Sequence, residues 1–228
     1  MKPALYLVPA ALGGAAVDAL TAPSAAIVRT LRDFAVENAK SARAFLGALG
    51  MPCAMRELRM QEITGDAAAL LAPLRAGRPL GVLSEAGCPA VADPGAALVA
   101  AAHAEGFRVI PLVGPSAILL ALMASGLEGQ RFAFCGYLPR EKQARSDRIR
   151  ALERRSRAEN ETQIFIETPY RNETLLAALL ECCEPATRLC VAADLTLPTE
   201  DIATRDVAQW RRLQASIGRR PAVFLLLA

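Results

Sequence analysis

The sequence has few residues of the kinds that build metal centres. It contains a single histidine, His103, in 228 residues, and its six cysteines include no Cys-x-x-Cys pair. Protein zinc sites use paired Cys or His ligands at such spacings, so we expect no metal site. The cysteines are expected to be small buried residues in a reducing compartment.

Long hydrophobic runs and a strong net charge are also missing. No apolar run approaches the roughly 20 residues that cross a bilayer, and the apolar part of Met1–Pro9 is too short for a signal peptide. We therefore expect a cytoplasmic protein without a membrane segment. The net charge of +3 is too small to indicate a nucleic-acid-binding protein by itself.

Hydrophobic residues are plentiful. Hydrophobic residues make up 53% of the chain, and the mean hydropathy is +0.27. A chain of this composition is expected to be globular, with a well-buried core, rather than disordered. Its length allows one large domain or two small ones.

The first half of the chain alternates short apolar runs with helical patterns. Strands are predicted at Leu5–Val8, Ala25–Arg29, Leu80–Leu83 and Arg108–Val113. Helices are predicted at Phe34–Leu49, Ala67–Leu74, Ala96–Ala104 and Ile118–Ser125. Alternation with short loops favours a mostly parallel sheet.

The second half has fewer crossovers and more opportunities for antiparallel pairing. Its predicted strands are Arg131–Leu138, Gln163–Glu167, Arg188–Asp194 and Ala222–Leu227. Its predicted helices are a charged one ending near Arg157, Glu173–Cys182 and Val207–Leu213. We therefore expect an α/β fold with two α/β lobes, residues 1–113 and 114–228, and a cleft between them. The sheet of the second lobe is expected to be mixed.

The stretch from Leu80 to Gly95 is the most informative one. Its apolar run stops at Ser84, and a loop punctuated by Gly and Pro follows, carrying the carboxylate of Glu85. Another predicted strand ends downstream in Gly114-Pro115-Ser116. Ligands of open α/β sheets bind at the carboxyl edge of the strands, so both loops are expected to face one ligand site.

Basic residues are concentrated in one segment. Two interpretations stay open, a solvated helix face, which is favoured, or a patch that follows phosphates. The residues are Arg131, Arg140, Lys142, Arg145, Arg148, Arg150, Arg154, Arg155 and Arg157.

Seven short motifs, in order, resemble those of a known superfamily. They are Ser84-Glu85-Ala86-Gly87-Cys88-Pro89, Asp93-Pro94-Gly95, the run from Pro111 to Ala117, Ser125-Gly126-Leu127, the run from Phe134 to Pro139, Glu167-Thr168-Pro169-Tyr170-Arg171, and Asp194-Leu195-Thr196. This series is similar to the tetrapyrrole-methylase superfamily of S-adenosylmethionine (SAM) enzymes. Within it, the chain most resembles the RsmI-type branch, the small-subunit rRNA cytidine 2′-O-methyltransferases. The resemblance spans nearly the whole chain.

The resemblance implies a homodimer with SAM in the cleft between two lobes. Transferred residue by residue, it implies cofactor contacts at Leu12, Ser84, Glu85, Gly87, Cys88, Gly114, Ser116, Ala117 and Thr168. Glu85 could accept hydrogen bonds from the ribose hydroxyls or the ammonium group of SAM. It could also simply cap local amides, and Asp93 could equally be a turn residue.

Substrate-side positions depart further from the family pattern. The segment Val36–Leu46 keeps Glu37 and Arg43 of the family's AEDTRHTRKLL but lacks its Asp-Thr-Arg core. No residue is identifiable as the catalytic base. The candidates for a catalytic role are Glu37, Lys40, Arg43 and Arg171; helical spacing makes a surface salt-bridge ladder the default for the first three, and Arg171 could be structural or could meet a nucleic-acid phosphate. The alternatives are a methyltransferase for a small tetrapyrrole-like molecule or another RNA, and a non-catalytic SAM-binding paralogue.

Overall fold

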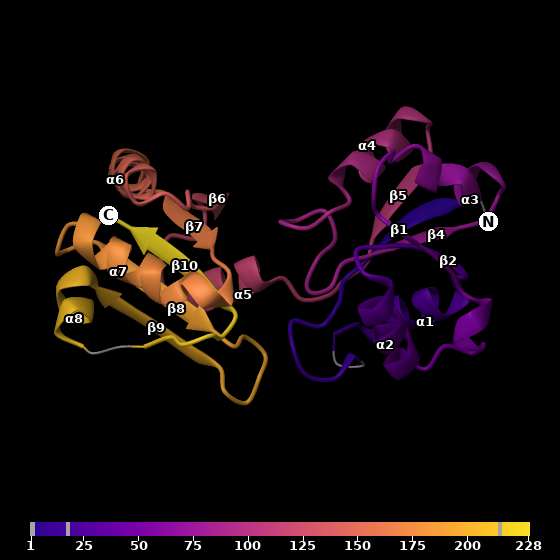
Figure 1. Cartoon of the computed structure of the whole chain (residues 1–228), viewed down its shortest axis with the longest axis horizontal. Coiled ribbons are helices and arrows are strands. Elements are labelled where there is room, and N and C mark those ends of the chain that lie inside the picture. Colours follow the sequence, from indigo (N-terminus) through magenta and orange to yellow (C-terminus); the bar gives the residue numbers. More distant parts are fainter. Residues whose placement is uncertain (1–2, 17–18, 214–215) are drawn as a thin grey trace. The chain divides into compact units, whose positions relative to one another are not determined.

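The computed structural model describes residues 3–16, 19–213 and 216–228. The chain divides into two units, Met1–Ser116 and Ala117–Ala228, which we call lobe 1 and lobe 2 (Figure 1). Each has its own five-stranded sheet and its own core. The expected fold class of two α/β lobes, one parallel and one mixed, is confirmed.

Lobe 1 is a parallel sheet with the strand order β3-β2-β4-β1-β5. The strands are β1 (Ala4–Val8), β2 (Asp33–Val36), β3 (Arg59–Glu62), β4 (Leu80–Leu83) and β5 (Arg108–Pro111). The helices are α1 (Ala22–Thr30), α2 (Ala39–Leu49), α3 (Ala72–Arg75) and α4 (Ala96–Ala104). Short 3₁₀ turns lie at Met55–Glu57 and Ala69–Leu71.

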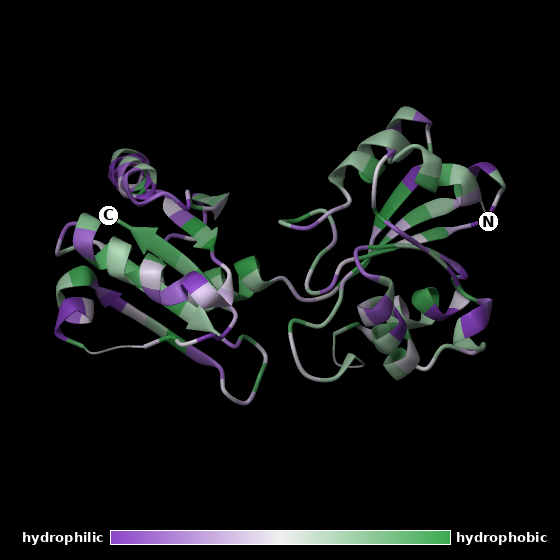
Figure 2. Ribbon diagram, viewed as in Figure 1, coloured by the Kyte–Doolittle hydropathy of each residue, from purple (hydrophilic) through white to green (hydrophobic). Residues whose placement is uncertain are grey.

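Helices cover both faces of this sheet. Tyr6, Val8 and Val36 pack with residues of α1 and α2, whereas Leu5 and Val82 pack with residues of α3 and α4. Strand side chains alternate between the two faces, so the central strands must be apolar on both. The strands in Figure 2 are accordingly mostly green.

Lobe 2 is a mixed sheet with the order β6-β7-β10-β8-β9, in which only β6 and β7 are parallel. The strands are β6 (Phe132–Tyr137), β7 (Thr162–Ile166), β8 (Arg188–Ala193), β9 (Asp201–Asp206) and β10 (Ala222–Leu227). The helices are α5 (Ala117–Ser125), α6 (Lys142–Glu159), α7 (Asn172–Cys182) and α8 (Val207–Arg212). Residues of α6, α7 and α8 share one core with the sheet, and α5 contacts β8, β9 and β10.

Two predictions in lobe 1 are wrong. Ala25–Arg29 is not a strand but part of α1, because the Thr21 side chain accepts a hydrogen bond from Ser24 N and proline occupies the first turn. The pattern Phe34–Leu49 is not one helix, because Phe34 lies in β2 and the Asn38 side chain caps a helix that begins at Ala39.

Three further differences concern short elements. The predicted helix Ala67–Leu74 is a 3₁₀ turn followed by the single-turn helix α3. Strands β3 and β9 were not predicted, since their sequences RMQE and DIATRD lack an apolar run. Both are edge strands of their sheets, where polar residues are typical.

Candidate functional site

The loops singled out from the sequence lie together at the carboxyl edge of the lobe 1 sheet. All five strands are parallel, so the segments that follow β1, β2, β4 and β5 leave the sheet at the same edge. Glu37 follows β2, Ser84 follows β4 and Leu112 follows β5. The prediction that the loops after β4 and β5 share one edge is confirmed.

Backbone hydrogen bonds join the loop after β4 to the loop after β1. Ala10 N donates to Gly87 O at 2.8 Å, and Gly87 N donates to Ala10 O at 3.2 Å. Gly87 has a φ of +68°, a conformation that favours glycine. A Cβ there would lie 3.3 Å from Cδ2 of Leu12, so Leu12 lies directly against the Gly87 turn.

The loop after β4 is also held by residues that follow β2. Glu85 N donates to Glu37 Oε2 at 2.9 Å, and the Ser41 hydroxyl donates to Glu85 Oε1 at 3.1 Å. The Glu85 side chain is exposed, and Oε2 accepts no hydrogen bond from a described residue. Glu85 is thus a fixed carboxylate with one oxygen available for a ligand.

A third carboxylate, Asp93, belongs to the same loop. Its pKa is raised to about 6, mainly by burial and also by the negative charges of Glu37 and Glu85, while the Ser84 hydroxyl acts in the opposite direction. At pH 7.5 Asp93 is therefore mostly ionised. The field of the three carboxylates Glu37, Glu85 and Asp93 favours a positively charged ligand over an anion.

A pocket of about 400 Å³ opens beside Glu85, between the loop after β1 and α2. Its volume falls within the range of small-molecule sites. Among the described residues of its lining, Glu85 is the only charged one and Phe45 the only aromatic one. The lining residues are Ala11, Gly14, Ala15, Ala16, Ala44, Phe45, Ala48 and Glu85.

The loop after β5 packs tightly against this assembly. A Cβ on Gly114 would lie 2.4 Å from Cβ of Pro9, so the backbone at residue 114 approaches the β1 loop at a distance that only glycine permits. The Cys88 thiol donates to Pro115 O at 3.3 Å, and burial raises the pKa of that thiol. Ser116 belongs to the same loop and is the last residue of lobe 1. Seven of the nine proposed cofactor residues therefore lie in lobe 1, on the three contacting loops after β1, β4 and β5.

The other two, Ala117 and Thr168, lie in lobe 2. Ala117 is the first residue of α5, and Thr168 follows β7. Arg171 Nη2 lies 2.9 Å from Oε2 of Glu167, whose side chain is 1% exposed. The buried carboxylate thus holds Arg171, a catalytic candidate, beside Thr168.

The remaining catalytic candidates lie on or before α2. Lys40 and Arg43 are exposed, and Arg43 donates only to Ala39 O of its own helix, at 3.4 Å. No ion pair joins them to Glu37 in the described part of the chain, so the default of a salt-bridge ladder is wrong. The sequence analysis did not predict that Ser41 and Phe45 belong to this site. A hydroxyl and an aromatic ring at helical spacing do not by themselves indicate a binding site in a single sequence.

The part of the chain that the structure describes has neither a metal-binding cluster nor a membrane-spanning helix. Across 3–16, 19–213 and 216–228, no three or more His, Cys, Asp or Glu side chains are grouped so that they could hold a metal ion. Over the same residues, no helix combines the length and hydrophobicity that a membrane span requires.

Comparisons with known proteins agree with this architecture. Residues 14–210 match the family of Tetrapyrrole (Corrin/Porphyrin) Methylases. The Ribosomal RNA small subunit methyltransferase I of Mesorhizobium japonicum is 33% identical to this chain, and the match covers 90% of this chain and 67% of that protein. The Ribosomal RNA small subunit methyltransferase I of Escherichia coli O157:H7 is 31% identical, and the match covers 87% of this chain and 67% of that protein. The crystal structure of uroporphyrin-III C-methyltransferase from Thermus thermophilus, complexed with S-adenosylhomocysteine, superposes with a TM-score of 0.57 at 16% identity, covering 98% of this chain and 97% of that one.

A parallel sheet with interlocked loops at its carboxyl edge, followed by a mixed α/β lobe, is the two-lobed architecture of these methyltransferases. The chain belongs to the tetrapyrrole methylase family. It is a SAM-dependent methyltransferase, similar to the enzymes that methylate small-subunit ribosomal RNA.

Proposed function

We propose that this methyltransferase transfers a methyl group from SAM to a ribose 2′-hydroxyl of small-subunit ribosomal RNA. The observation that carries the proposal is the fixed Glu85 carboxylate at the carboxyl edge of the lobe 1 sheet, in a chain that resembles rRNA methyltransferases over 90% of its length. The proposed cofactor residues are Leu12, Ser84, Glu85, Gly87, Cys88, Gly114, Ser116, Ala117 and Thr168.

The residues at this edge fit SAM chemically. SAM carries a sulfonium and an ammonium group, and three carboxylates, Glu37, Glu85 and Asp93, provide the opposite charge. We expect Glu85 Oε2 to accept a hydrogen bond from the ammonium or from ribose hydroxyls, and such charge-assisted bonds are strong. The pocket beside it offers apolar walls to the uncharged parts of a ligand.

The chain needs to supply little covalent chemistry. SAM provides a methyl group on a positively charged sulfur, which is already a good electrophile. The substrate oxygen gains the methyl group and loses its proton, and S-adenosylhomocysteine remains as the second product. Positioning the hydroxyl in line with the methyl group and excluding water account for most of the rate gain.

The base that takes the proton is unassigned, and the candidates for a catalytic role are Glu37, Lys40, Arg43 and Arg171. Of these, Glu37 is the only carboxylate, but one of its oxygens already accepts from Glu85 N. We therefore assign Glu37 to positioning the β4 loop, and Lys40 and Arg43, which are exposed on α2, to the side that meets the substrate. By family resemblance we also expect a homodimer that acts in the cytoplasm.

The test is methyl transfer to purified small ribosomal subunits that lack ribose methylation. The protein is incubated with isotopically labelled SAM, the RNA is digested to nucleosides, and these are identified by mass spectrometry. The proposal expects one labelled 2′-O-methylated nucleoside, absent when the subunits or the enzyme are omitted. Tight binding of S-adenosylhomocysteine without transfer to RNA would instead favour a SAM-binding protein with another role.

A further inference from the structure

Positive charge is concentrated on one helix of lobe 2. Between Arg131 and Arg157 the chain has nine basic and three acidic residues, a net charge of +6, although the whole chain is only +3. Seven of the nine lie on α6, which Figure 2 shows largely in purple beside the green strands of its sheet. The helix therefore forms a local positive surface on a nearly neutral protein.

The inner face of α6 accounts for its stability. Ile149 and Leu152 are fully buried in the core of lobe 2. The buried carboxylate of Glu153 accepts hydrogen bonds from Glu184 N and from the Thr187 hydroxyl. Glu153 is consequently engaged inside the lobe and does not neutralise the arginines on the surface.

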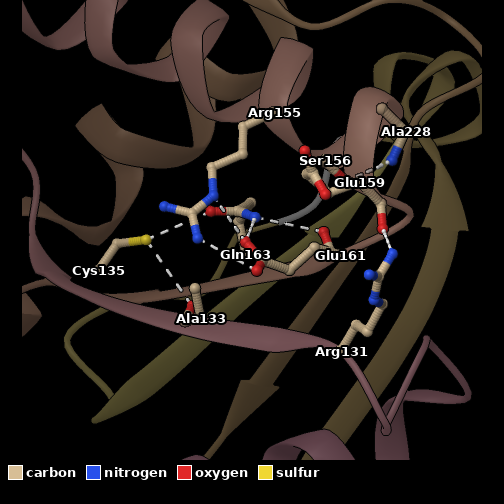
Figure 3. Close-up of polar contacts among 9 residues, drawn as sticks. All are labelled: Arg131, Ala133, Cys135, Arg155, Ser156, Glu159, Glu161, Gln163 and Ala228. Atoms are coloured by element: carbon tan, nitrogen blue, oxygen red, sulfur yellow. Dashed lines mark hydrogen bonds and ion pairs between the residues drawn. The ribbon is translucent and has the colours of Figure 1, made fainter.

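Two arginines, Arg155 on α6 and Arg131 just before β6, are used inside lobe 2. Arg155 Nε lies 2.8 Å from Glu161 Oε1, which also accepts from Gln163, and Arg131 Nη1 donates to Glu159 O at 2.8 Å (Figure 3). The Cys135 thiol, which donates to the Gln163 side chain, belongs to the same network. Arg155 and Arg131 thus act as structural residues rather than as free cations.

Other arginines of α6 have little or no neutralising partner. Arg150, Arg154 and Arg157 follow the spacing i, i+4, i+7, which places them in one stripe about 10 Å long. Arg154 and Arg157 have no carboxylate within 4.0 Å among the described residues, and Arg150 has only Asp147, at 3.7 Å. Both members of that pair are at least half exposed, so it contributes little.

We propose that the stripe Arg150–Arg154–Arg157 binds consecutive phosphates of an RNA backbone without reading sequence. Guanidinium groups bind phosphate bidentately, and the stripe has the spacing to follow a strand. The outward face of α6 also carries Asp147, Ala151 and Ala158 but no large apolar side chain, so it lacks what a membrane-binding helix would insert. The choice of RNA as partner rests on the proposed function.

The test compares binding to a labelled twelve-residue oligouridylate over a range of salt concentrations. Each phosphate contact to a single strand contributes about 0.7 to the slope of log affinity against log salt. The double variant Arg154→Gln/Arg157→Gln should therefore lower that slope by about 1.4 and weaken binding at low salt. Glutamine is a good helix former, so α6 is retained, which unchanged affinity for S-adenosylhomocysteine and an unchanged circular dichroism spectrum would confirm.

A matched control removes the same charge elsewhere. Arg108 at the start of β5 and Arg212 at the end of α8 are exposed and form no ion pair with a described residue. Arg108→Gln/Arg212→Gln should leave the slope nearly unchanged. An equal loss in both double variants would mean that only net charge matters, and the proposal would be wrong.

Two other results would also overturn the proposal. In the first, the stripe variant shows the same salt slope as the wild type. In the second, the wild-type protein binds phosphatidylserine vesicles but not the oligonucleotide. The oligouridylate assay requires no methyl transfer, so it separates this proposal from the preceding one. If the protein methylates ribosomal RNA but the stripe variant keeps the wild-type slope, only the proposal of the stripe is refuted. If the stripe variant has a lowered slope but no RNA is methylated, only the proposed substrate is refuted.

Discussion

Replacing Gly114 by alanine tests whether the loops after β1 and β5 are pressed together as the structure shows. The new Cβ would lie 2.4 Å from Cβ and 2.7 Å from Cγ of Pro9, whereas ordinary contacts begin at 3.4 Å. The two loops must therefore separate by about 1 Å. Gly114 does not have a positive φ, so the cost is steric rather than conformational. Overpacking of this kind costs about 1–3 kcal/mol.

Urea unfolding followed by circular dichroism measures this cost, with Gly47→Ala as the control. Gly47 lies inside α2, and a Cβ there meets nothing within 4 Å. The control should therefore stabilise the protein by about 1 kcal/mol, opposite in sign to Gly114→Ala. Gly114→Ala should also weaken binding of S-adenosylhomocysteine, because Ser116 moves with the loop. A Gly114→Ala variant as stable as the wild type would refute this arrangement of the loops.

Two further substitutions test the electrostatics of lobe 1. Because the pKa of Asp93 is raised in the folded state, that state binds more protons than the unfolded chain between pH 3.8 and about 6, and stability falls as the pH rises through this window. Asp93→Asn should remove this pH dependence. Above pH 6 the variant should be more stable than the wild type by about 1 kcal/mol, after allowing for solvent screening. Equal pH profiles of the two proteins in urea unfolding would contradict this prediction. Asp33, whose pKa is lowered mainly by its hydrogen bond from Arg59, also accepts from Arg78. Asp33→Asn should destabilise lobe 1 at pH 7 by about 1–2 kcal/mol. The difference should shrink as the pH falls below the normal pKa of aspartate and vanish only below the lowered pKa of folded Asp33, where the wild type also loses the interaction.

The sequence was most informative where a strand is buried and is followed by a loop of special geometry. Leu80–Leu83 is buried on both faces of the sheet, so its apolar run was a reliable signal. The following loop was recognised from its Gly and Pro residues and from its motifs. The predicted shared edge of the β4 and β5 loops follows from the parallel topology alone.

Local pattern was insufficient where capping residues or sheet edges decide the structure. The apolar, β-branched run around Ile27 and Val28 suggested a strand, but the cap at Thr21 and the proline of the first turn make it a helix. The strand β3 has a polar sequence because its position at the sheet edge leaves most of its residues exposed.

The site shows the same limit. Nothing in the sequence linked Ser41 to Glu85, 44 residues away, or Glu37 to the amide of Glu85. These contacts depend on the placement of β2 next to β4, which is a property of the sheet order rather than of any local pattern. They also give Glu37 a positioning task in place of the expected salt-bridge ladder.

The measurement that tests the central claim most directly is calorimetric titration of the wild-type protein and of Glu85→Gln with S-adenosylhomocysteine. Loss of one charge-assisted hydrogen bond should cost about 1.5–3 kcal/mol, a 10- to 100-fold weaker Kd. Glu57→Gln, an exposed carboxylate before β3 without a hydrogen-bonded partner among the described residues, serves as the control and should bind as the wild type does. Equal affinity of Glu85→Gln and wild type, or no binding by either, would contradict a cofactor site at the carboxyl edge of lobe 1.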